Sequence, residues 1–274
     1  MFNNKNLTFE PSLNIPTPEN YVLGPGDEVI IDIWGNSELT VRQVISPEGS
    51  INVSNIGPIY LNGKRIQEAS SYLKTMFSRI YSDLASENPS TFLKVSLGQI
   101  RSIQVNVMGE IVMPGTYMLP SLATVFHALY AAGGVNNVGT LRDVVLYRNG
   151  KAFKHVDVYD YIMNGNNSFD ITLQDGDLIN VGTYEKIVTV VGKVKRPMRY
   201  EMKGEESLTQ LLEYAGGFAS DAYKKNVNVS RKGDSEFQIY TVNNADFAGF
   251  ILADGDSIMI DPIITRYENR VTVD

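Results

Sequence analysis

Five cationic side chains lie within eleven residues of the second half of the chain, and they are the side chains best suited to bind a ligand. They are Lys193, Lys195, Arg196, Arg199 and Lys203, with Tyr200 among them. A cluster of like charges attracts an oppositely charged polymer, so this pattern favours binding of an acidic glycan. The alternative is a solvated strand edge, where charge discourages pairing with another sheet.

The remaining candidates for chemistry favour structural roles. The chain has no cysteine and two histidines, His127 and His155, and neither has an acidic partner at metal-ligand spacing. Asp175–Asp177 and Asp254–Asp256 lack the further oxygen ligands of a calcium loop, so we interpret both as turns. The sequence contains no nucleophile elbow, and nothing pairs its carboxylates for glycoside hydrolysis. We therefore predict neither enzymatic activity nor a cofactor.

The composition is that of an acidic, folded chain. Of the 274 residues, 43% are hydrophobic and 20% are charged, and the net charge is −7. This length has room for two or more domains with cores of their own. The negative charge argues against general nucleic-acid binding, because contacts with phosphates need a basic face. No apolar run approaches the ~18–20 residues needed to cross a bilayer.

The chain contains an internal repeat. Val105–Tyr117 recurs 83 positions later as Val188–Tyr200. Glycine and proline positions match at this offset: Gly109 with Gly192, Pro114 with Pro197, and Gly133-Gly134 with Gly216-Gly217. Self-similarity at a fixed period indicates one structural unit used more than once, so we predict that the two units share a fold.

Each repeat is predicted to combine one short helix with several strands, which makes it an α+β module. We expect strands at 103–108, 115–119, 144–148 and 178–181 in the first repeat, and at 187–191, 198–202, 227–230, 237–242 and 257–260 in the second. Ser121 and Ser207 are predicted to cap the two helices. Both helices are expected to end at a glycine pair, where a positive φ costs little.

The N-terminal part is predicted to be a further α+β domain behind an extended arm at residues 1–20, where prolines block helix formation. Gly24-Pro25-Gly26-Asp27 is predicted to be a turn, because neither the lysine nor the helix of a phosphate-binding loop follows it. The strands expected here are 29–34, 41–45, 50–53 and 92–97, with Gly49 in the turn of a hairpin between the second and the third. Residues 66–81 have the apolar spacing of an amphipathic helix.

Two groups of residues resemble a known family. Leu23–Ile31, Ser46–Ile51 and Gly57–Ile59 resemble the N-terminal domain of the outer-membrane polysaccharide export proteins. The doubled unit, Val-x-Val-x-Gly followed by Pro, Tyr, Ala-Gly-Gly and Asp-Gly-Asp, resembles the soluble-ligand-binding β-grasp (SLBB) repeat that follows that domain. The resemblance covers nearly all of Tyr21–Asp261, including the order of the modules.

The resemblance implies an export domain at 21–98 and two tandem β-grasp-like repeats at 99–183 and 184–262. It implies a non-catalytic subunit that associates into a periplasmic ring at the outer membrane and guides a capsular polysaccharide or exopolysaccharide. An inner-membrane polysaccharide co-polymerase is the implied partner. The sequence departs from the pattern at Lys193, which replaces the glutamate of the first repeat, and at Met198, which replaces a turn glycine. The family's C-terminal membrane helix and lipid-bearing N-terminal cysteine have no counterpart.

Two alternatives to this interpretation differ in class. The repeats of a monomer can bind a soluble glycan or small ligand without any channel, and a polysaccharide-modifying enzyme is the third possibility. The end of the sequence adds one more expectation. Tyr267–Val273 matches Tyr184–Val190 at the offset of 83, so residues 263–274 are predicted to begin a third repeat of a longer protein.

Overall fold

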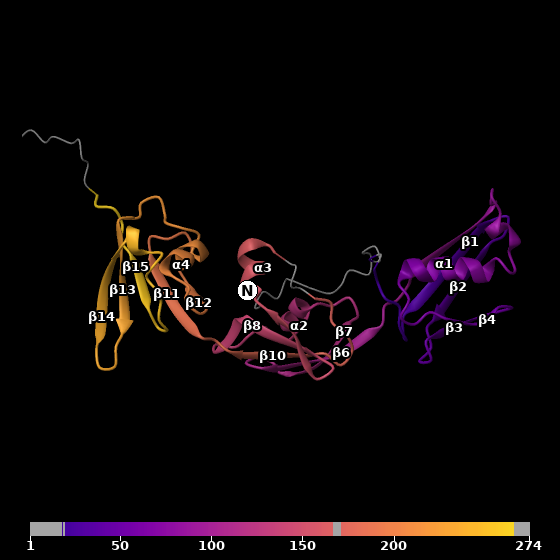
Figure 1. The fold of residues 1–274 in the computed structure, drawn as a ribbon, viewed down its shortest axis with the longest axis horizontal. Coiled ribbons are helices and arrows are strands. Elements are labelled where there is room, and N and C mark those ends of the chain that lie inside the picture. Colours follow the sequence, from indigo (N-terminus) through magenta and orange to yellow (C-terminus); the bar gives the residue numbers. More distant parts are fainter. Residues whose placement is uncertain (1–17, 19, 167–170, 266–274) are drawn as a thin grey trace, which may run out of the picture. The chain divides into compact units, whose positions relative to one another are not determined.

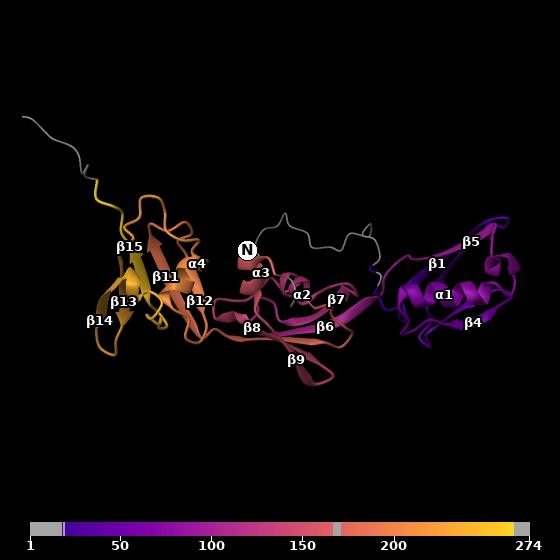
Figure 2. The ribbon, with the colours of Figure 1, turned by 45° about the horizontal axis from the view of Figure 1, so that its top comes forward.

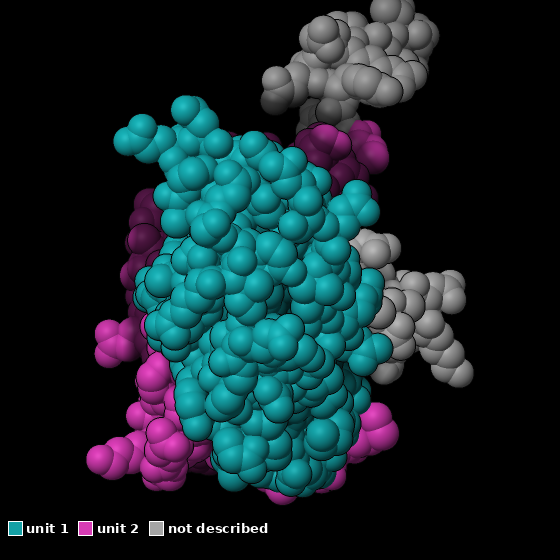
Figure 3. All heavy atoms as spheres, turned by 90° about the vertical axis from the view of Figure 1, so that its right-hand side faces the viewer, with its two compact units in different colours: residues 1–107, 115–133, 171–178 teal, residues 108–114, 134–170, 179–274 magenta. Residues whose placement is uncertain are grey.

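The computed structural model describes residues 18, 20–166 and 171–265 (Figure 1). Nearly all of the predicted arm at 1–20, and the predicted third-repeat strand at 267–273, lie outside the described residues. The described chain divides into two compact units (Figure 3). Unit 1 joins residues 1–107, which include the N-terminal domain and most of β6, to residues 115–133 and 171–178 of the first repeat. Unit 2 holds the other residues of the first repeat together with the second repeat. This division runs through the first repeat rather than beside it.

The N-terminal domain packs one helix against a small antiparallel sheet. Its elements are β1 (Glu28–Gly35), β2 (Leu39–Val44), β3 (Ser50–Val53), β4 (Gly57–Tyr60), α1 (Ile66–Phe77), a 3₁₀ turn (Ser82–Ala85) and β5 (Thr91–Leu97). The sheet order is β2-β1-β5, and β3 pairs with β4. Ala69, Leu73 and Phe77 bury one face of α1 in a common core with Val29 and Ile31. The predicted helix is confirmed, although it ends at Phe77 instead of residue 81.

The hairpin predicted around Gly49 is wrong. β2 pairs with β1, whereas β3 pairs with β4, a strand that the sequence analysis did not predict. Asn55 lies in the turn between β3 and β4 and Gly57 begins β4, and their φ angles are 67° and 92°. These left-handed residues reverse the chain tightly, so the nearest partner of β3 is the strand that follows it.

The two repeats have the same strand order. In the first, β6 (Ser102–Gly109), β7 (Gly115–Pro120), β8 (Gly139–Arg148), β9 (Lys151–Val156) and β10 (Leu178–Thr183) are ordered β7-β6-β10-β8-β9. In the second, β11 (Lys186–Gly192), β12 (Arg199–Met202), β13 (Asn226–Lys232), β14 (Phe237–Asn243) and β15 (Ser257–Ile260) are ordered β12-β11-β15-β13-β14. The orders correspond strand for strand, which confirms the predicted common fold. β9 and β14 form corresponding edges of the two sheets (Figure 2).

The repeated glycine at the end of the first strand of each unit meets a strict backbone requirement. Gly109 and Gly192 both have a φ of 86°. A Cβ at Gly109 would lie 2.1 Å from the carbonyl oxygen of Val181, and one at Gly192 would lie 2.1 Å from that of Ile260. Only glycine adopts this conformation at such close approach, which explains why the residue recurs in both repeats.

The helices of the repeats are α2 (Val125–Ala131) and α4 (Leu208–Tyr214), and each is followed by its predicted glycine pair. Ser207 is the N-cap residue of α4, as predicted. The N-cap residue of α2 is Thr124, so the prediction for Ser121 is wrong. Ser121 instead lies 2.7 Å from the hydroxyl oxygen of Tyr21 in a buried hydrogen bond.

The repeats differ after their edge strands. The first repeat continues from β9 into α3 (Val158–Asn164), whose N-cap residue, Asp157, accepts a hydrogen bond from the N–H of Tyr159. The second continues from β14 into a single 3₁₀ turn (Asn244–Asp246). Neither β9 nor α3 was predicted. Because α3 belongs to one repeat alone, side chains on and before it are available to only one of the two units.

Candidate functional site

The structure divides the predicted cation cluster between the two ends of one strand pair. Lys186 at the start of β11 lies opposite Met202 at the end of β12. Lys203, which follows Met202, therefore lies at the far end of this pair from the loop 193–198. The loop and the first residue of β12 bring together Lys193, Lys195, Arg196 and Arg199.

Two of the predicted ligand-binding residues have structural contacts instead. Tyr200 is 1% exposed, and its hydroxyl donates a 2.6 Å hydrogen bond to the carbonyl oxygen of Arg196. The core covers its ring, which corrects the prediction of a ligand contact there. The Nζ of Lys203 donates to the carbonyl oxygen of Arg142 at 3.3 Å, and its N–H donates to Glu206 Oε2 at 2.8 Å. Lys203 thus belongs to another group of residues, which surrounds Arg142.

Hydrogen bonds hold the backbone of the cationic loop. Its amide groups donate to carbonyl oxygens at 2.9–3.1 Å, namely Lys193 to Ile260, Lys195 to Gly217 and Arg196 to Ala215. Lys193 also pairs its Nζ with Asp221 Oδ2 at 2.6 Å. The side chains of Lys195, Arg196 and Arg199 are exposed. The loop therefore presents these three cations from a fixed backbone.

The first repeat builds the same loop from different side chains. The N–H of Val112 donates to the carbonyl oxygen of Gly134 at 3.0 Å, which is the counterpart of the bond from Lys195. Val112 and Met113 stand where the second repeat has Lys195 and Arg196, and they are 54% and 53% exposed. One backbone thus presents apolar side chains in the first repeat and cations in the second.

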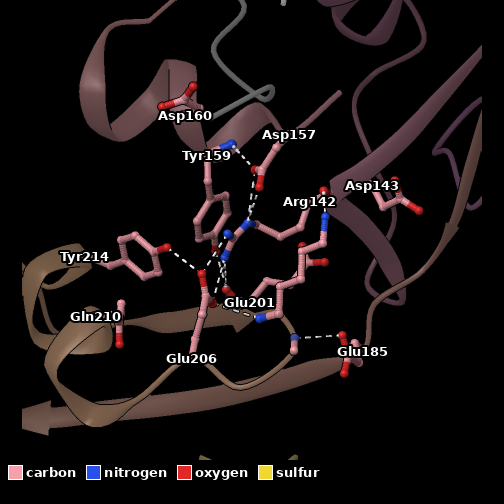
Figure 4. Close-up of polar contacts among 12 residues, drawn as sticks. Arg142, Asp143, Asp157, Tyr159, Asp160, Glu185, Glu201, Glu206, Gln210 and Tyr214 are labelled. Atoms are coloured by element: carbon pink, nitrogen blue, oxygen red, sulfur yellow. Dashed lines mark hydrogen bonds and ion pairs between the residues drawn. The ribbon is translucent and has the colours of Figure 1, made fainter. Parts of the chain in front are cut away.

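A cluster that the sequence analysis did not predict surrounds Arg142 on β8 (Figure 4). Arg142 is 7% exposed. Its Nε lies 3.0 Å from Asp157 Oδ2, and its Nη2 lies 2.9 Å from Glu206 Oε1. The rings of Tyr159 and Tyr214 flank the guanidinium group, with centroids 4.7 and 5.4 Å from its carbon. The buried charge is thereby paired, hydrogen-bonded and covered by aromatic faces.

Glu201 on β12 completes the cluster. It is 5% exposed, and its carboxylate accepts a hydrogen bond from the hydroxyl of Thr140 and one of 2.8 Å from the N–H of Leu141. Its own N–H donates to the hydroxyl oxygen of Tyr159 at 2.8 Å. We call this group the Arg142 cluster; it comprises Thr140, Arg142, Asp157, Tyr159, Glu201, Glu206 and Tyr214. It joins side chains of the first repeat to side chains of the second.

The surroundings of the Arg142 cluster shift several pKa values. Burial raises the pKa of Glu201, against the hydrogen bonds from Thr140 and Leu141. Burial also opposes ionisation of Glu206, but hydrogen bonds from Arg142, Lys203 and Tyr214 outweigh it and lower the pKa of Glu206. Burial raises the pKa values of Tyr159 and Tyr214 to about 12. Because its acids and bases are committed to one another, the cluster functions as a structural joint.

The sequence contains a signal that identifies Arg142. Val144 and Leu146 are buried residues of a predicted strand, and side chains two positions apart share one face of a strand. Arg142 precedes Val144 by two positions and therefore falls on the buried face. A charged side chain is rarely buried without partners, so its position alone calls for carboxylates nearby.

Three aspartate turns recur through the described chain. Asp27, Asp177 and Asp256 are at most 1% exposed, and each carboxylate accepts a backbone N–H from the residue three positions before it at 2.8–2.9 Å. Arg101 pairs with Asp27 and Arg231 pairs with Asp256. These contacts confirm that the Asp-Gly-Asp motifs and Gly24–Asp27 are turns.

Family comparisons agree with this arrangement of modules. The family model for polysaccharide biosynthesis/export proteins matches residues 15–96. Two models of the SLBB domain match residues 103–181 and 187–240. The chain belongs to the polysaccharide export proteins. It carries an N-terminal export domain followed by two SLBB domains.

Curated relatives of this export protein include two described as the polysialic acid transport protein KpsD of Escherichia coli. Each is 24% identical over 257 residues. The alignment covers 93% of this chain and 44% of each relative. The export protein chain therefore spans less than half the length of the curated relatives that it matches.

The histidines of this export protein have partners. His127 Nδ1 lies 2.6 Å from the hydroxyl oxygen of Thr124 at the start of α2, and His155 Nδ1 lies 2.6 Å from Asp143 Oδ1. Asp143 is 12 residues from His155 in the sequence, and the pairing of β8 with β9 brings the two side chains together. Among the described residues, no group of three or more potential ligands is arranged to hold a metal ion. No helix in the same part of the chain combines the length and apolar character needed to span a bilayer.

Proposed function

We propose that this chain is the periplasmic part of a polysaccharide export channel subunit, associated with the outer membrane. It guides a capsular polysaccharide or exopolysaccharide outward without making or breaking covalent bonds. Copies of the full-length protein associate into a ring, and an inner-membrane polysaccharide co-polymerase delivers the polymer. The observation that carries the proposal is the order of an export domain and two SLBB domains in one chain.

The Arg142 cluster supports an architectural role. Arg142 on β8 of the first SLBB domain is 7% exposed and pairs with Glu206, which lies between β12 and α4 of the second domain. Its other pair, with Asp157 at the start of α3, lies within the first domain. A buried charge whose partner is removed is strongly destabilising, so such a joint resists separation of the two domains. A protein that guides a polymer needs this kind of mechanical continuity between neighbouring domains.

Deletion of the gene in its own bacterium tests the proposal. We expect cell-surface polysaccharide to fall sharply, while polymer of unchanged composition accumulates inside the cell. Restoring the full-length gene should restore surface polymer. Unchanged surface polymer in the deletion strain would overturn the export role. Retained polymer with altered sugar composition or linkage would overturn the non-catalytic role, because a subunit that only guides polymer leaves its bonds intact.

A further inference from the structure

One end of the second SLBB sheet concentrates positive charge. Residues 193–199 and 221–225 hold six cationic side chains and one acidic side chain, in a chain whose net charge is −7. The two segments lie side by side, because Lys193 donates its N–H to Ile260 and Tyr223 donates its N–H to Asp261. The ion pair between Lys193 and Asp221 also joins them. We call these two segments the basic end.

Most cations of the basic end are available to a ligand. Of the six cations of the basic end, Lys193 alone forms an ion pair with another described residue. Its partner, Asp221, is the single acid of the two segments. Five cations remain exposed: Lys195, Arg196, Arg199, Lys224 and Lys225. Arg199 begins β12 and its side chain projects away from the core, because the next residue, Tyr200, is buried.

The fixed backbone of the loop reduces the cost of presenting these charges. The N–H groups of Lys195 and Arg196 are both hydrogen-bonded. Gly216 packs closely against both residues, since a Cβ added to it would lie 3.3 Å from Arg196 Nε and 3.4 Å from Lys195 Cβ. A ligand that binds here does not have to order the loop first, so less conformational entropy is lost on binding.

The first SLBB domain shows that the fold does not require these charges. Its matching segments, 110–116 and 138–142, carry exposed apolar side chains at Val112, Met113 and Val138. The only cation in them is Arg142, which is buried. Since the same backbone forms with apolar side chains, the cations of the second domain have a separate role.

We propose that the basic end binds the carboxylate groups of an acidic polysaccharide, which makes an acidic polymer the substrate of the proposed export function. Exposed ion pairs are individually weak and are screened by salt. Weak contacts suit a polymer that must move past the site rather than stay on it. The exposed Met198 precedes Arg199, and the partly exposed Tyr223 precedes Lys224 and Lys225, so cations for the carboxylate and apolar surface for the sugar face are neighbours in the sequence.

The test is a binding titration of the purified chain with hyaluronan, a polymer with one carboxylate per disaccharide, with neutral dextran as the comparison. The test variant is Lys195→Gln with Arg199→Gln, which removes two exposed charges and leaves the contacts of Arg196 and Tyr200 intact. The control is Lys151→Gln with Lys154→Gln, which removes two exposed charges from β9 of the other domain.

We expect hyaluronan to bind and dextran not to bind. The affinity for hyaluronan should fall about three- to tenfold in the test variant and by less than about twofold in the control, consistent with two weak exposed pairs. It should also fall as salt rises. Val112→Lys with Met113→Arg, which gives the first domain the cations of the second, should raise the affinity.

Equal affinity of the test variant and the wild type would overturn the proposal, as would equal binding of dextran, or binding that does not depend on salt. Equal losses in the test variant and the control would indicate attraction to overall charge and would also overturn it. The proposal rests on the export function, but the two fail separately. If hyaluronan binds at the basic end while gene deletion leaves surface polymer unchanged, the chain is a glycan-binding module and the export role is wrong.

Discussion

The two SLBB domains share a backbone but differ in where they place their charges. In the first, Arg142 is buried two positions before Val144 on β8. In the second, the corresponding residue two positions before Val227 is Lys225, which is exposed. The first domain buries its cation in a joint, and the second presents its cation to solvent. The glycines and turns set the fold of both domains, whereas a few side chains decide what each sheet end contacts.

The residues of the second domain that contact Arg142 and Thr140 also differ from their counterparts in the first domain. Glu201 of the second domain is buried against Thr140, while Met118 at the matching position of the first domain is 66% exposed. Glu206 of the second domain corresponds to Ala123 of the first. The first repeat therefore supplies the cation and Asp157, and the second supplies the carboxylates of Glu201 and Glu206. The joint is therefore asymmetric, because the two repeats contribute different side chains to it although their folds are alike. In this sense the joint has a direction along the chain.

Replacing the buried cation should give the largest effect. Arg142→Ala leaves the carboxylates of Asp157 and Glu206 without their guanidinium partner, and removal of one member of a buried pair costs about 3–5 kcal/mol. Lys225→Ala at the matching exposed position should change stability by less than about 0.5 kcal/mol. Chemical denaturation measures both values, and hydrogen exchange should locate the loss at β12 and α4. Similar costs for the two variants would break the comparison.

The shared glycine turn should give the next effect, and it should be equal in the two domains. Gly109→Ala and Gly192→Ala each add about 1–3 kcal/mol of backbone strain, and contact of the new Cβ with a carbonyl oxygen raises the cost further. Gly176→Ala separates the two contributions, because its φ is 79° and no atom lies within 4 Å of the added Cβ. Thermal unfolding checks the order. If Gly176→Ala is as destabilising as Gly109→Ala, the close approach has no energetic role.

The acid dependence of stability should give the smallest effect. The lowered pKa of Glu206 means that the folded chain binds fewer protons than the unfolded chain. This contribution is present above the ordinary carboxyl pKa and is lost as pH falls through the lowered pKa of Glu206. As pH falls from neutral into the acid range, the wild type should therefore lose more stability than Glu206→Gln, whose side chain carries no ionisable group.

Denaturation at a series of pH values measures this difference, and Glu205→Gln is the matched control, because Glu205 is the exposed neighbour of Glu206. The control should keep the acid dependence of the wild type. Parallel pH profiles for the wild type and Glu206→Gln would show that Arg142 does not depend on this carboxylate.

The sequence predicted those parts of the fold that depend on local rules. Gly109 and Gly192 recur because their backbone conformation admits no side chain, and the capping serine of α4 follows directly from its position before an apolar run. Strand alternation located most of the strands. Which strands pair with each other was harder to predict from the sequence. The sequence of β3 has the same alternation whether it pairs with β2 or with β4, and only the tight turn at Asn55 decides between them.

The Arg142 cluster was missed because its members are far apart in the chain. Arg142 and Glu206 are 64 residues apart, and nothing in the repeat pattern links them, since the matching residues Lys225 and Ala123 are unlike them. The cation cluster was found for the opposite reason, because its members are close in sequence. Closeness in sequence also led the prediction to include Tyr200 and Lys203. Strand alternation turns the side chain of Tyr200 into the core, and the length of β12 places Lys203 at the other end of the strand pair.

The direction of the joint constrains how genes for such chains recombine. A tandem duplication of the first repeat would set Arg142 of one copy against Met118 and Ala123 of the next, where no carboxylate is available. In the new protein Arg142 would keep its pair with Asp157 but would lose the Glu206 carboxylate, and breaking part of a buried ion-pair network is destabilising in a domain of marginal stability. A crossover keeps all the contacts of the joint if it inherits residues 140–159 together with 201–214. The number of SLBB repeats in such a chain is therefore limited by the need to inherit these two segments together, and not by the similarity of the repeats.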